Sequence, residues 1–298
     1  MVVTSALIDA TVCLLLVSAG VGTLVSVNDP SAVGGPASGE RAADRADATA
    51  ETLATATASV NYSLATGVRE AGGPTDRLPR LDGNRFRRTD HGSLARLLAD
   101  AAVANTTVDG RRTSLASVGF VRAVRTTVAN RTGPRVQVVA LWRPSPGGAV
   151  EGRVVAGAEP PRTGAVHAAA LAVPVGGTGN SGASRRTGEA SFGRLAEGVA
   201  RKTIRTLVPA GRTETALRAD YPASALVEHR YRRLGAALGV EVLPAVERGN
   251  TTAANRQLTR VLQPRVERGL RDRFPSAERA GESTAASRVR IVVRTWSP

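Results

Sequence analysis

The chain of 298 residues is long enough for one large domain or two small ones, and a hydrophobic content of 42% excludes a wholly disordered chain. Its net charge of +15 comes almost entirely from arginine, since Lys202 is the only lysine, and it permits contact with anionic lipid, nucleic acid or acidic protein surfaces. Cys13 is the only cysteine, which excludes disulfides within the chain and cysteine-based metal sites.

The N-terminal segment predicts a membrane anchor. Residues 10–27 carry no charge, and a helix of this length nearly spans a hydrocarbon core of about 30 Å. No lysine or arginine precedes Leu7 and no A-x-A cleavage motif follows, so we expect 1–27 to be an uncleaved signal-anchor that inserts through residues 4–27. We expect Asp9 at the membrane interface; a functional carboxylate inside the membrane is the alternative.

Two patterns disagree about the side of the membrane on which the rest of the chain lies. Arg41 and Arg45 follow the anchor and no base precedes it, which by the positive-inside rule favours the cytoplasm. The chain also has more N-x-[S/T] sequons than its eight asparagines would give by chance, which favours an exoplasmic domain at the cell membrane. We expect the exoplasmic side. The candidate glycosylation sites are Asn61, Asn105, Asn130 and Asn250.

The segment after the anchor combines loops and helices. A Pro/Gly/Ser-rich stretch predicts a flexible linker over 28–39, and an Ala-rich stretch with alternating charges predicts an exposed helix over 40–58. Arg77–Arg88 is the densest positive run and predicts a basic loop. Apolar periodicity predicts helices over 90–104 and 113–131.

Three β-branched runs follow and predict strands. They cover 135–143, 150–156 and 166–175, and together they suggest a small antiparallel meander. A Gly/Ser-rich stretch, 176–188, then predicts a surface loop. Its glycines do not match a phosphate-binding motif. This loop divides the soluble chain into a part with helices and strands, 40–175, and a mainly helical part that follows.

The second part, 189–298, is predicted to be helical except at its end. Amphipathic helices are expected over 189–208 and 224–240, and a third contains Pro264, which should kink or split it. The alternation in Arg288–Trp296 is typical of a half-buried strand, which we expect to return to the meander. The predicted fold class is therefore α+β, with one transmembrane helix before a mixed domain.

No catalytic, metal-binding or cofactor-binding signature occurs in the sequence. His91, His167 and His229 lack the spacing of metal ligands, and there is no G-x-S-x-G or Ser-x-x-Lys motif. Acidic residues are scattered and mostly stand beside arginines, which favours ion pairs over acid–base catalysis. We expect no enzyme and no cofactor, and a domain that acts through protein partners.

The alternative hypothesis is a module that binds polyanions, such as lipid headgroups or nucleic acid, through two arginine clusters. Neither cluster has the interleaved aromatic rings that single-stranded nucleic acid stacks on, so nucleic acid is not indicated. The clusters are Arg77, Arg80, Arg85, Arg87 and Arg88 in the basic loop, and Arg194, Arg201 and Arg205 along a helix.

The chain also resembles a family of uncharacterised haloarchaeal membrane-anchored proteins that are often encoded beside type IV pilus-like gene clusters. The resemblance rests on LIDATVCLLLVSAG (7–20), VQVVALWRPSPG (136–147), RADYPASAL (218–226) and RVRIVVRTWSP (288–298). It implies an archaeal cell-surface location and an accessory role beside a filament or secretion apparatus. It brings no catalytic residues. A pilin-type processing site is missing before the helix, so the chain is not interpreted as a pilin.

Overall fold

The structure is a computed structural model and describes residues 36–70, 83–114, 116–176, 191–284 and 288–297. The predicted anchor, including Asp9 and Cys13, lies outside the described residues, as do Arg77, Arg80 and nearly all of the predicted Gly/Ser loop. No helix in the described ranges is long and apolar enough to cross a membrane.

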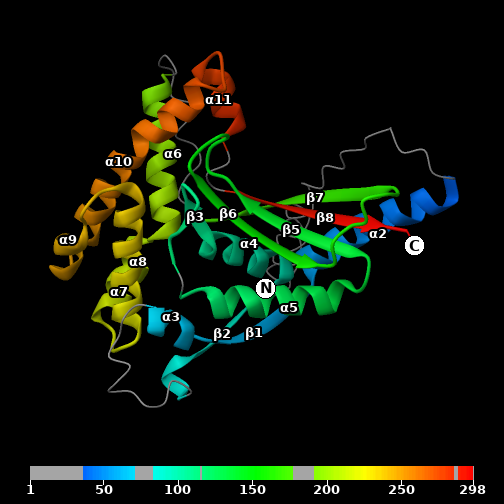
Figure 1. The fold of residues 1–298 in the computed structure, drawn as a ribbon, viewed down its shortest axis with the longest axis horizontal. Helices are drawn as coiled ribbons and strands as arrows, with labels where there is room; N and C mark the ends of the chain where they lie inside the picture. The colour runs from blue at the N-terminus through cyan, green and yellow to red at the C-terminus, as the bar shows by residue number, and fades with distance from the viewer. Residues whose placement is uncertain (1–35, 71–82, 115, 177–190, 285–287, 298) are drawn as a thin grey trace, which may run out of the picture.

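A six-stranded antiparallel sheet forms the centre of the fold, with the strand order β4-β3-β6-β5-β8-β7 (Figure 1). The three β-branched runs and the C-terminal run are all strands, as predicted. The strands of the sheet are β3 (Thr106–Val108), β4 (Arg111–Arg112), β5 (Val136–Trp142), β6 (Val150–Gly157), β7 (Val166–Pro174) and β8 (Arg288–Trp296).

The order of the strands corrects the predicted meander. β5 and β6 form a hairpin, but β7 pairs with neither of them, because β8 inserts between β5 and β7 and is antiparallel to both. Such a pairing between distant segments depends on loop closure over a long stretch of chain, which no local pattern encodes. The insertion places the C-terminal strand inside the six-stranded sheet, and the predicted mixed α+β class is confirmed.

Three helices cover one face of the sheet, called the inner face below: α2 (Pro36–Thr55), α4 (Leu94–Ala104) and α5 (Val118–Thr132). In β8, every second residue points to the inner face, and these residues are completely or almost completely buried. α4 contacts β5, β6 and β8, α2 contacts β7 and β8, and α5 lies beside β6. Figure 1 shows α4 and α5 below the strands.

The first helix after the predicted anchor differs from its prediction. The sequence predicts a linker over 28–39 and an exposed helix over 40–58, whereas α2 already includes residues 36–39 and ends at Thr55. One face of α2 is buried against the sheet because small side chains allow helix and strands to approach closely. Because alanine is only weakly apolar, a stripe of alanines gives little apolar periodicity, and the sequence therefore predicts an exposed helix. The buried residues are Ala42, Ala46, Ala50 and Leu53.

A separate two-stranded ribbon packs against α5. It is formed by β1 (Thr57–Ser63) and β2 (Arg87–Ser93), which pair along their whole length. The short helix α3 (Ala65–Glu70) follows β1, and a 3-10 turn, η2 (Asn84–Phe86), precedes β2. The described end of the predicted basic loop is therefore a turn and a strand. The predicted helix over 90–104 begins only at residue 94, because its first four residues belong to β2.

Six helices form the remaining part, which lies at the left and top of Figure 1. The residues of the apolar stripes predicted for the three long helices are buried or partly buried. α10 runs through Pro264 as one helix, so the predicted split is wrong. Buried residues of these helices and of the sheet form one continuous core. The helices are α6 (Phe192–Leu207), α7 (Ala210–Arg218), α8 (Ala223–Leu238), α9 (Leu243–Glu247), α10 (Thr251–Arg271) and α11 (Ala277–Ser283).

Candidate interaction surface

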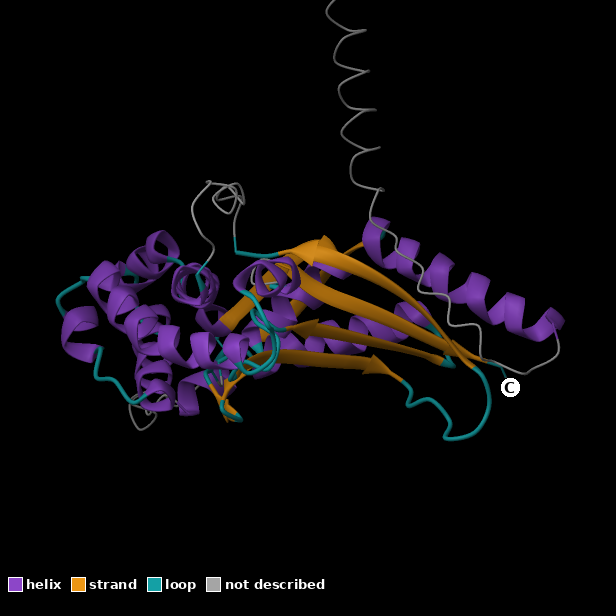
Figure 2. Ribbon diagram, turned by 90° about the horizontal axis from the view of Figure 1, so that it is seen from above, coloured by secondary structure: helices purple, strands orange, loops and turns teal. Residues whose placement is uncertain are grey.

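The sheet has a second face, called the outer face below, which points away from α4 and α5. Figure 2 is seen from the side opposite to these helices and shows the strands in front of them. Two-residue periodicity assigns to this face the residues between the buried ones of each strand. An antiparallel sheet with one covered and one open face is normally polar on the open face. The outer face departs from that pattern.

The antiparallel register aligns four apolar residues in one row across the outer face. Val139 of β5 is opposite Val155 of β6 on one side and Val292 of β8 on the other, and Val292 is opposite Ala170 of β7. Val139 is 8% exposed, and the other three are partly exposed. We call these four residues the valine rung. It crosses four strands, about 14 Å at the usual spacing between strands.

The row on one side of the valine rung contains two exposed arginines. Arg153 of β6 is opposite Leu141 of β5, which is opposite Arg290 of β8, and Ala172 of β7 completes the row. No carboxylate stands in this row. The nearest acidic residue on the outer face of β6 is Glu151, two positions from Arg153, and it already forms an ion pair with Arg143.

The row on the other side contains a third exposed arginine. Arg294 of β8 is opposite Gln137 of β5 and Ala168 of β7, and its Nη1 donates to Gln137 Oε1 over 3.4 Å. The opposite residue of β6 is Gly157. The outer face thus has an apolar centre with arginines on both sides and no acidic side chain in the three rows. This arrangement can bind an apolar ridge that carries carboxylates on its flanks.

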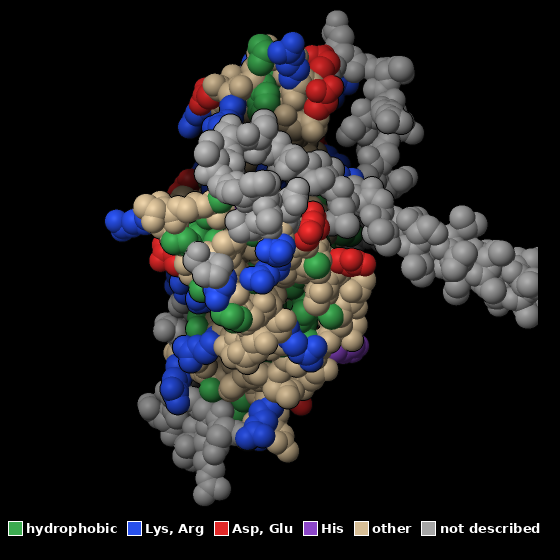
Figure 3. Space-filling model, turned by 90° about the vertical axis from the view of Figure 1, so that its right-hand side faces the viewer, with side chains coloured by type: hydrophobic (Ala, Val, Ile, Leu, Met, Phe, Trp, Pro, Cys, Tyr) green, Lys and Arg blue, Asp and Glu red, His purple; other side chains and the backbone are tan. Residues whose placement is uncertain are grey.

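The sequence-predicted arginine clusters are not brought together. The described members of the first cluster, Arg85, Arg87 and Arg88, lie near the β1–β2 ribbon, whereas the second lies on α6 at another end of the molecule (Figure 1). In the first cluster, the Nη1 of Arg88 donates to the carbonyl oxygens of Arg85 and Arg87 over 2.8 and 2.7 Å. Figure 3 shows basic side chains spread singly over the visible face rather than gathered in one patch.

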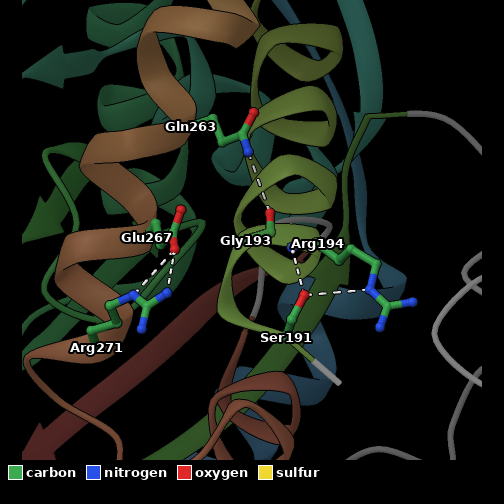
Figure 4. A network of polar contacts seen from close by, with 6 residues as sticks. All are labelled: Ser191, Gly193, Arg194, Gln263, Glu267 and Arg271. Carbon is green, nitrogen blue, oxygen red and sulfur yellow. Dashed lines mark hydrogen bonds and ion pairs between the residues drawn. The ribbon is translucent and has the colours of Figure 1, made fainter. Parts of the chain in front are cut away.

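The second cluster is partly engaged in contacts within the helical part. Arg201 forms an ion pair with Glu197 one turn away, and Arg194 Nε donates to Ser191 Oγ, the cap of α6, over 3.3 Å. Arg205 is exposed. Figure 4 shows the adjoining contacts between α6 and α10. The contacts of Arg194 and Arg201 are thus local to α6 and its cap.

A hydrogen bond and a cation–π contact join α6 to α10, and an ion pair within α10 holds the arginine of the cation–π contact. Gln263 Nε2 of α10 donates to the Gly193 carbonyl of α6 over 3.4 Å, and the Nη2 of Arg271 donates to Glu267 Oε1 over 2.6 Å (Figure 4). The guanidinium carbon of Arg271 also lies 5.2 Å from the ring centre of Phe192, a cation–π contact.

The four sequon asparagines differ in what their side-chain amides do. Asn105 Nδ2 donates to the Arg153 carbonyl over 2.7 Å, so the nitrogen that would carry a glycan is engaged. Asn61 and Asn250 are exposed and use only their Oδ1 atoms, as acceptors from Thr89 Oγ1 and from the Ala253 amide. Asn130 is exposed on α5. Geometry therefore permits modification at three sequons and disfavours it at Asn105.

The histidines and possible metal ligands of the described part of the chain are dispersed over several elements. No cluster of three or more His, Cys, Asp or Glu residues capable of holding a metal occurs among the described residues. His91 is exposed, His167 is partly exposed and His229 is buried, each on a different element. Sequence reasoning missed the pair formed by Tyr62 and Asp90, because it depends on the unpredicted ribbon.

Comparisons with known proteins give a family but no function. A family model described as a family of unknown function (DUF7284) matches residues 8–296, and the chain belongs to this family. No curated protein and no solved structure matches the chain.

Proposed function

For this member of a family of unknown function, we propose a non-catalytic role as a membrane-anchored exoplasmic domain that binds another protein through the outer face of its sheet. The observation that carries the proposal is the valine rung between rows with Arg153, Arg290 and Arg294, on a face that α4 and α5 leave open. Together with the resemblance noted in the sequence, this favours an accessory component of an archaeal surface or pilus-like assembly.

The arrangement of the outer face favours a protein partner over a polyanion. A polyanion gains affinity from many arginines that release counterions, and it gains nothing from a row of valines. A protein interface combines an apolar centre with a polar rim, and arginine is enriched in such interfaces. The partner best suited to this face has an apolar stripe about 14 Å long with carboxylates on both sides, as an acidic amphipathic helix has.

Topology is tested first, because the proposal requires the domain to be outside. Protease added to intact host cells should remove the domain while a cytoplasmic marker protein stays intact. Complete protection of the domain on intact cells, with cleavage after lysis, would place it in the cytoplasm and overturn the exoplasmic part of the proposal.

Site-directed crosslinking tests the surface itself. A photoreactive amino acid at Val292 in the full chain, expressed in host cells, should give one defined adduct with another protein. The same amino acid at Ala236, exposed on α8, serves as the control position. An adduct from Ala236 with equal yield, or no adduct from Val292, would contradict the proposed surface.

Charge reversal then links that adduct to the arginines. The double variant Arg290→Glu/Arg294→Glu should lose the Val292 adduct, because carboxylates of the partner would face carboxylates of the domain. The matched control is Arg205→Glu/Arg260→Glu, which has the same change in net charge on exposed helical positions. If both double variants lose the adduct equally, net charge and not the outer face controls the contact.

Binding to a polyanion remains the alternative function, and vesicles separate the two. On this alternative, the full chain without its partner would bind vesicles of anionic lipid with an affinity that falls steeply as salt is raised. Arg205→Glu/Arg260→Glu, which changes a member of the second arginine cluster, would weaken that binding at least as much as Arg290→Glu/Arg294→Glu. The protein-contact proposal instead expects the Val292 adduct to be lost in Arg290→Glu/Arg294→Glu and kept in Arg205→Glu/Arg260→Glu.

A further inference from the structure

We propose that two copies of this chain pair through β7, in antiparallel orientation, and so join their two six-stranded sheets into one. The proposal concerns the edge of the sheet and not its outer face. It rests on a difference between the two edge strands and on the residues that pairing of two β7 strands would place opposite one another.

The two edges of the sheet are protected to very different degrees. The edge strand β4 consists of two residues, Arg111 and Arg112, both exposed. A short, charged edge resists pairing with another chain. The edge strand β7 is nine residues long, Val166–Pro174, and contains no charged residue. Natural proteins usually block a long edge with charges, a bulge or a covering helix. α2 runs beside β7 in Figure 2 and packs against it from the inner face, and Arg96 Nη1 donates to the Pro174 carbonyl at the end of the strand over 3.3 Å. The strand itself has neither a charge nor a bulge, and this long uncharged edge indicates a pairing surface.

The end of β7 carries a further sign of an interface. Val166 is 40% exposed, and among the described residues it is the one large hydrophobic side chain that is well exposed to solvent. On the outer face of β7, the exposed residues after it are Ala168, Ala172 and Pro174. These side chains are small, so they leave the backbone of the edge accessible to a second strand.

The sequence of β7 is complementary to itself when the strand is reversed. Pairing along the full length of both strands centres on Ala170, which then stands opposite Ala170 of the second copy. No like charges meet, and the largest side chains meet small or apolar ones. The opposed pairs are Val166 with Pro174, His167 with Val173, Ala168 with Ala172, and Ala169 with Leu171.

The same register aligns the valine rungs of the two copies. Ala170 is the last member of the valine rung, so a two-fold axis beside it continues the row into the second copy without a step. That axis is perpendicular to the sheet, and both outer faces therefore point the same way. α2 contacts β7 and β8 from the inner face, so the α2 helices of both copies lie on the opposite side of the joined sheet.

The two α2 helices then come close to one another beneath the joined strands. Their exposed positions carry both signs, which allows ion pairs between them instead of repulsion. The exposed charged residues of α2 are Arg41, Asp44, Arg45, Asp47 and Glu51.

Cysteine crosslinking of the full chain in detergent tests this register directly. In a Cys13→Ser background, Ala170→Cys should form a crosslinked dimer under mild oxidation or with a short thiol crosslinker, since paired residues have α carbons about 5 Å apart. Ala172→Cys should not crosslink with itself, because it faces Ala168. A mixture of Ala172→Cys and Ala168→Cys chains should crosslink. Arg111→Cys, on the opposite edge, is the control for random collision.

The outcomes separate pairing of β7 from association through the anchor. Crosslinking at Ala170 but not at Ala172 or Arg111 supports the proposal. No crosslink at Ala170, or equal crosslinking at all three positions, overturns it, even if the chain is dimeric in detergent through its anchor.

A charge at the centre provides a second, independent test. Ala170→Asp places two carboxylates opposite one another in the pair but leaves a partly exposed position in the monomer, so the crosslinked fraction should fall several-fold with an unchanged circular dichroism spectrum. Crosslinking for this measurement uses Ala168→Cys and Ala172→Cys chains that also carry Ala170→Asp. An unchanged crosslinked fraction would overturn the proposal.

Discussion

Gly152 in β6 lies directly against the carbonyl oxygen of Ala102 in α4, and a methyl group added at Gly152 would be 2.2 Å from that oxygen. No side chain can occupy such a space, and the nearest obstacle is the backbone of α4, which the core holds in place. We therefore expect Gly152→Ala to lower the free energy of unfolding by roughly 2–3 kcal/mol, as overpacking of a core does. Urea denaturation followed by circular dichroism measures the change.

The control for this substitution is the same change where space is free. Gly198 is exposed on α6, has no atom within 4 Å of an added methyl group and does not have a positive φ. Gly198→Ala should raise the free energy of unfolding by about 0.5–1 kcal/mol, because alanine restricts the unfolded chain. If both variants are destabilised alike, the close approach of α4 to β6 is not the cause.

Arg230 in α8 provides a test of a partly buried cation with an unsatisfied Nε. Its Nε is buried without a hydrogen-bond partner among the described residues, and burial lowers the pKa of its guanidinium. Arg230→Met keeps the length of the stem and removes the desolvated charge, so we expect the free energy of unfolding to rise by about 1 kcal/mol. The measurement is the midpoint of thermal unfolding.

A neighbouring arginine on the same helix should respond with the opposite sign. Arg233 Nε donates to the Arg112 carbonyl of β4 over 2.9 Å. Arg233→Met makes the same change in charge and removes this hydrogen bond, so the midpoint of unfolding should fall. A rise for both variants would mean that the reduction in net charge, and not the local contact, determines stability.

The sequence predicts well those elements whose apolar residues are large and periodic. β8 is recognised because Val289, Ile291 and Val293 alternate with arginines, and the structure buries these three residues. The long helices α8 and α10 are recognised in the same way, because large apolar residues repeat at the helical period on one side.

The sequence fails where small or polar residues form an element through pairing alone. β2 contains no apolar residue, and five of its seven residues are exposed, so only its pairing with β1 makes it a strand. The buried face of α2 is mostly alanine and is therefore missed. The valine rung could not be predicted either. Val139, Val155, Val292 and Ala170 belong to four strands, and only the register after insertion of β8 aligns them.

Tyr62 on β1 makes stability depend on pH in the alkaline range. Its hydroxyl donates to Asp90 Oδ2 over 3.0 Å, and burial, together with the Asp90 carboxylate, raises the pKa of Tyr62 well above its usual value of about 10. The neutral phenol is thus favoured in the folded state. Its contribution is fully present below pH about 10 and is lost as the pH rises further, because the unfolded chain ionises first.

Tyr62→Phe keeps the ring, whose centre lies 5.2 Å from that of Phe120, and removes only the hydroxyl. We expect a loss of about 1 kcal/mol at pH 8 and a smaller decline between pH 9 and 11.5 than in the natural chain. Some decline should remain, because burial also raises the pKa of Tyr231. The decline in stability is measured from the midpoint of urea denaturation at each pH. Parallel pH profiles for the variant and the natural chain would refute the assignment to Tyr62.

Thr295 in β8 ties the end of the chain to the helix that follows the predicted anchor. Its buried Oγ1 donates to the Ala42 carbonyl of α2 over 2.5 Å. Thr295→Val has nearly the same shape and removes the donor, so we expect a loss of about 1 kcal/mol and faster tryptic cleavage after Arg41 and Arg45 as α2 separates more often from the sheet. The control is Thr203→Val, whose hydroxyl bonds within α6 alone. It should lower global stability to a similar degree without faster cleavage in α2, and equal cleavage in both variants would show that α2 unfolds only with the whole domain.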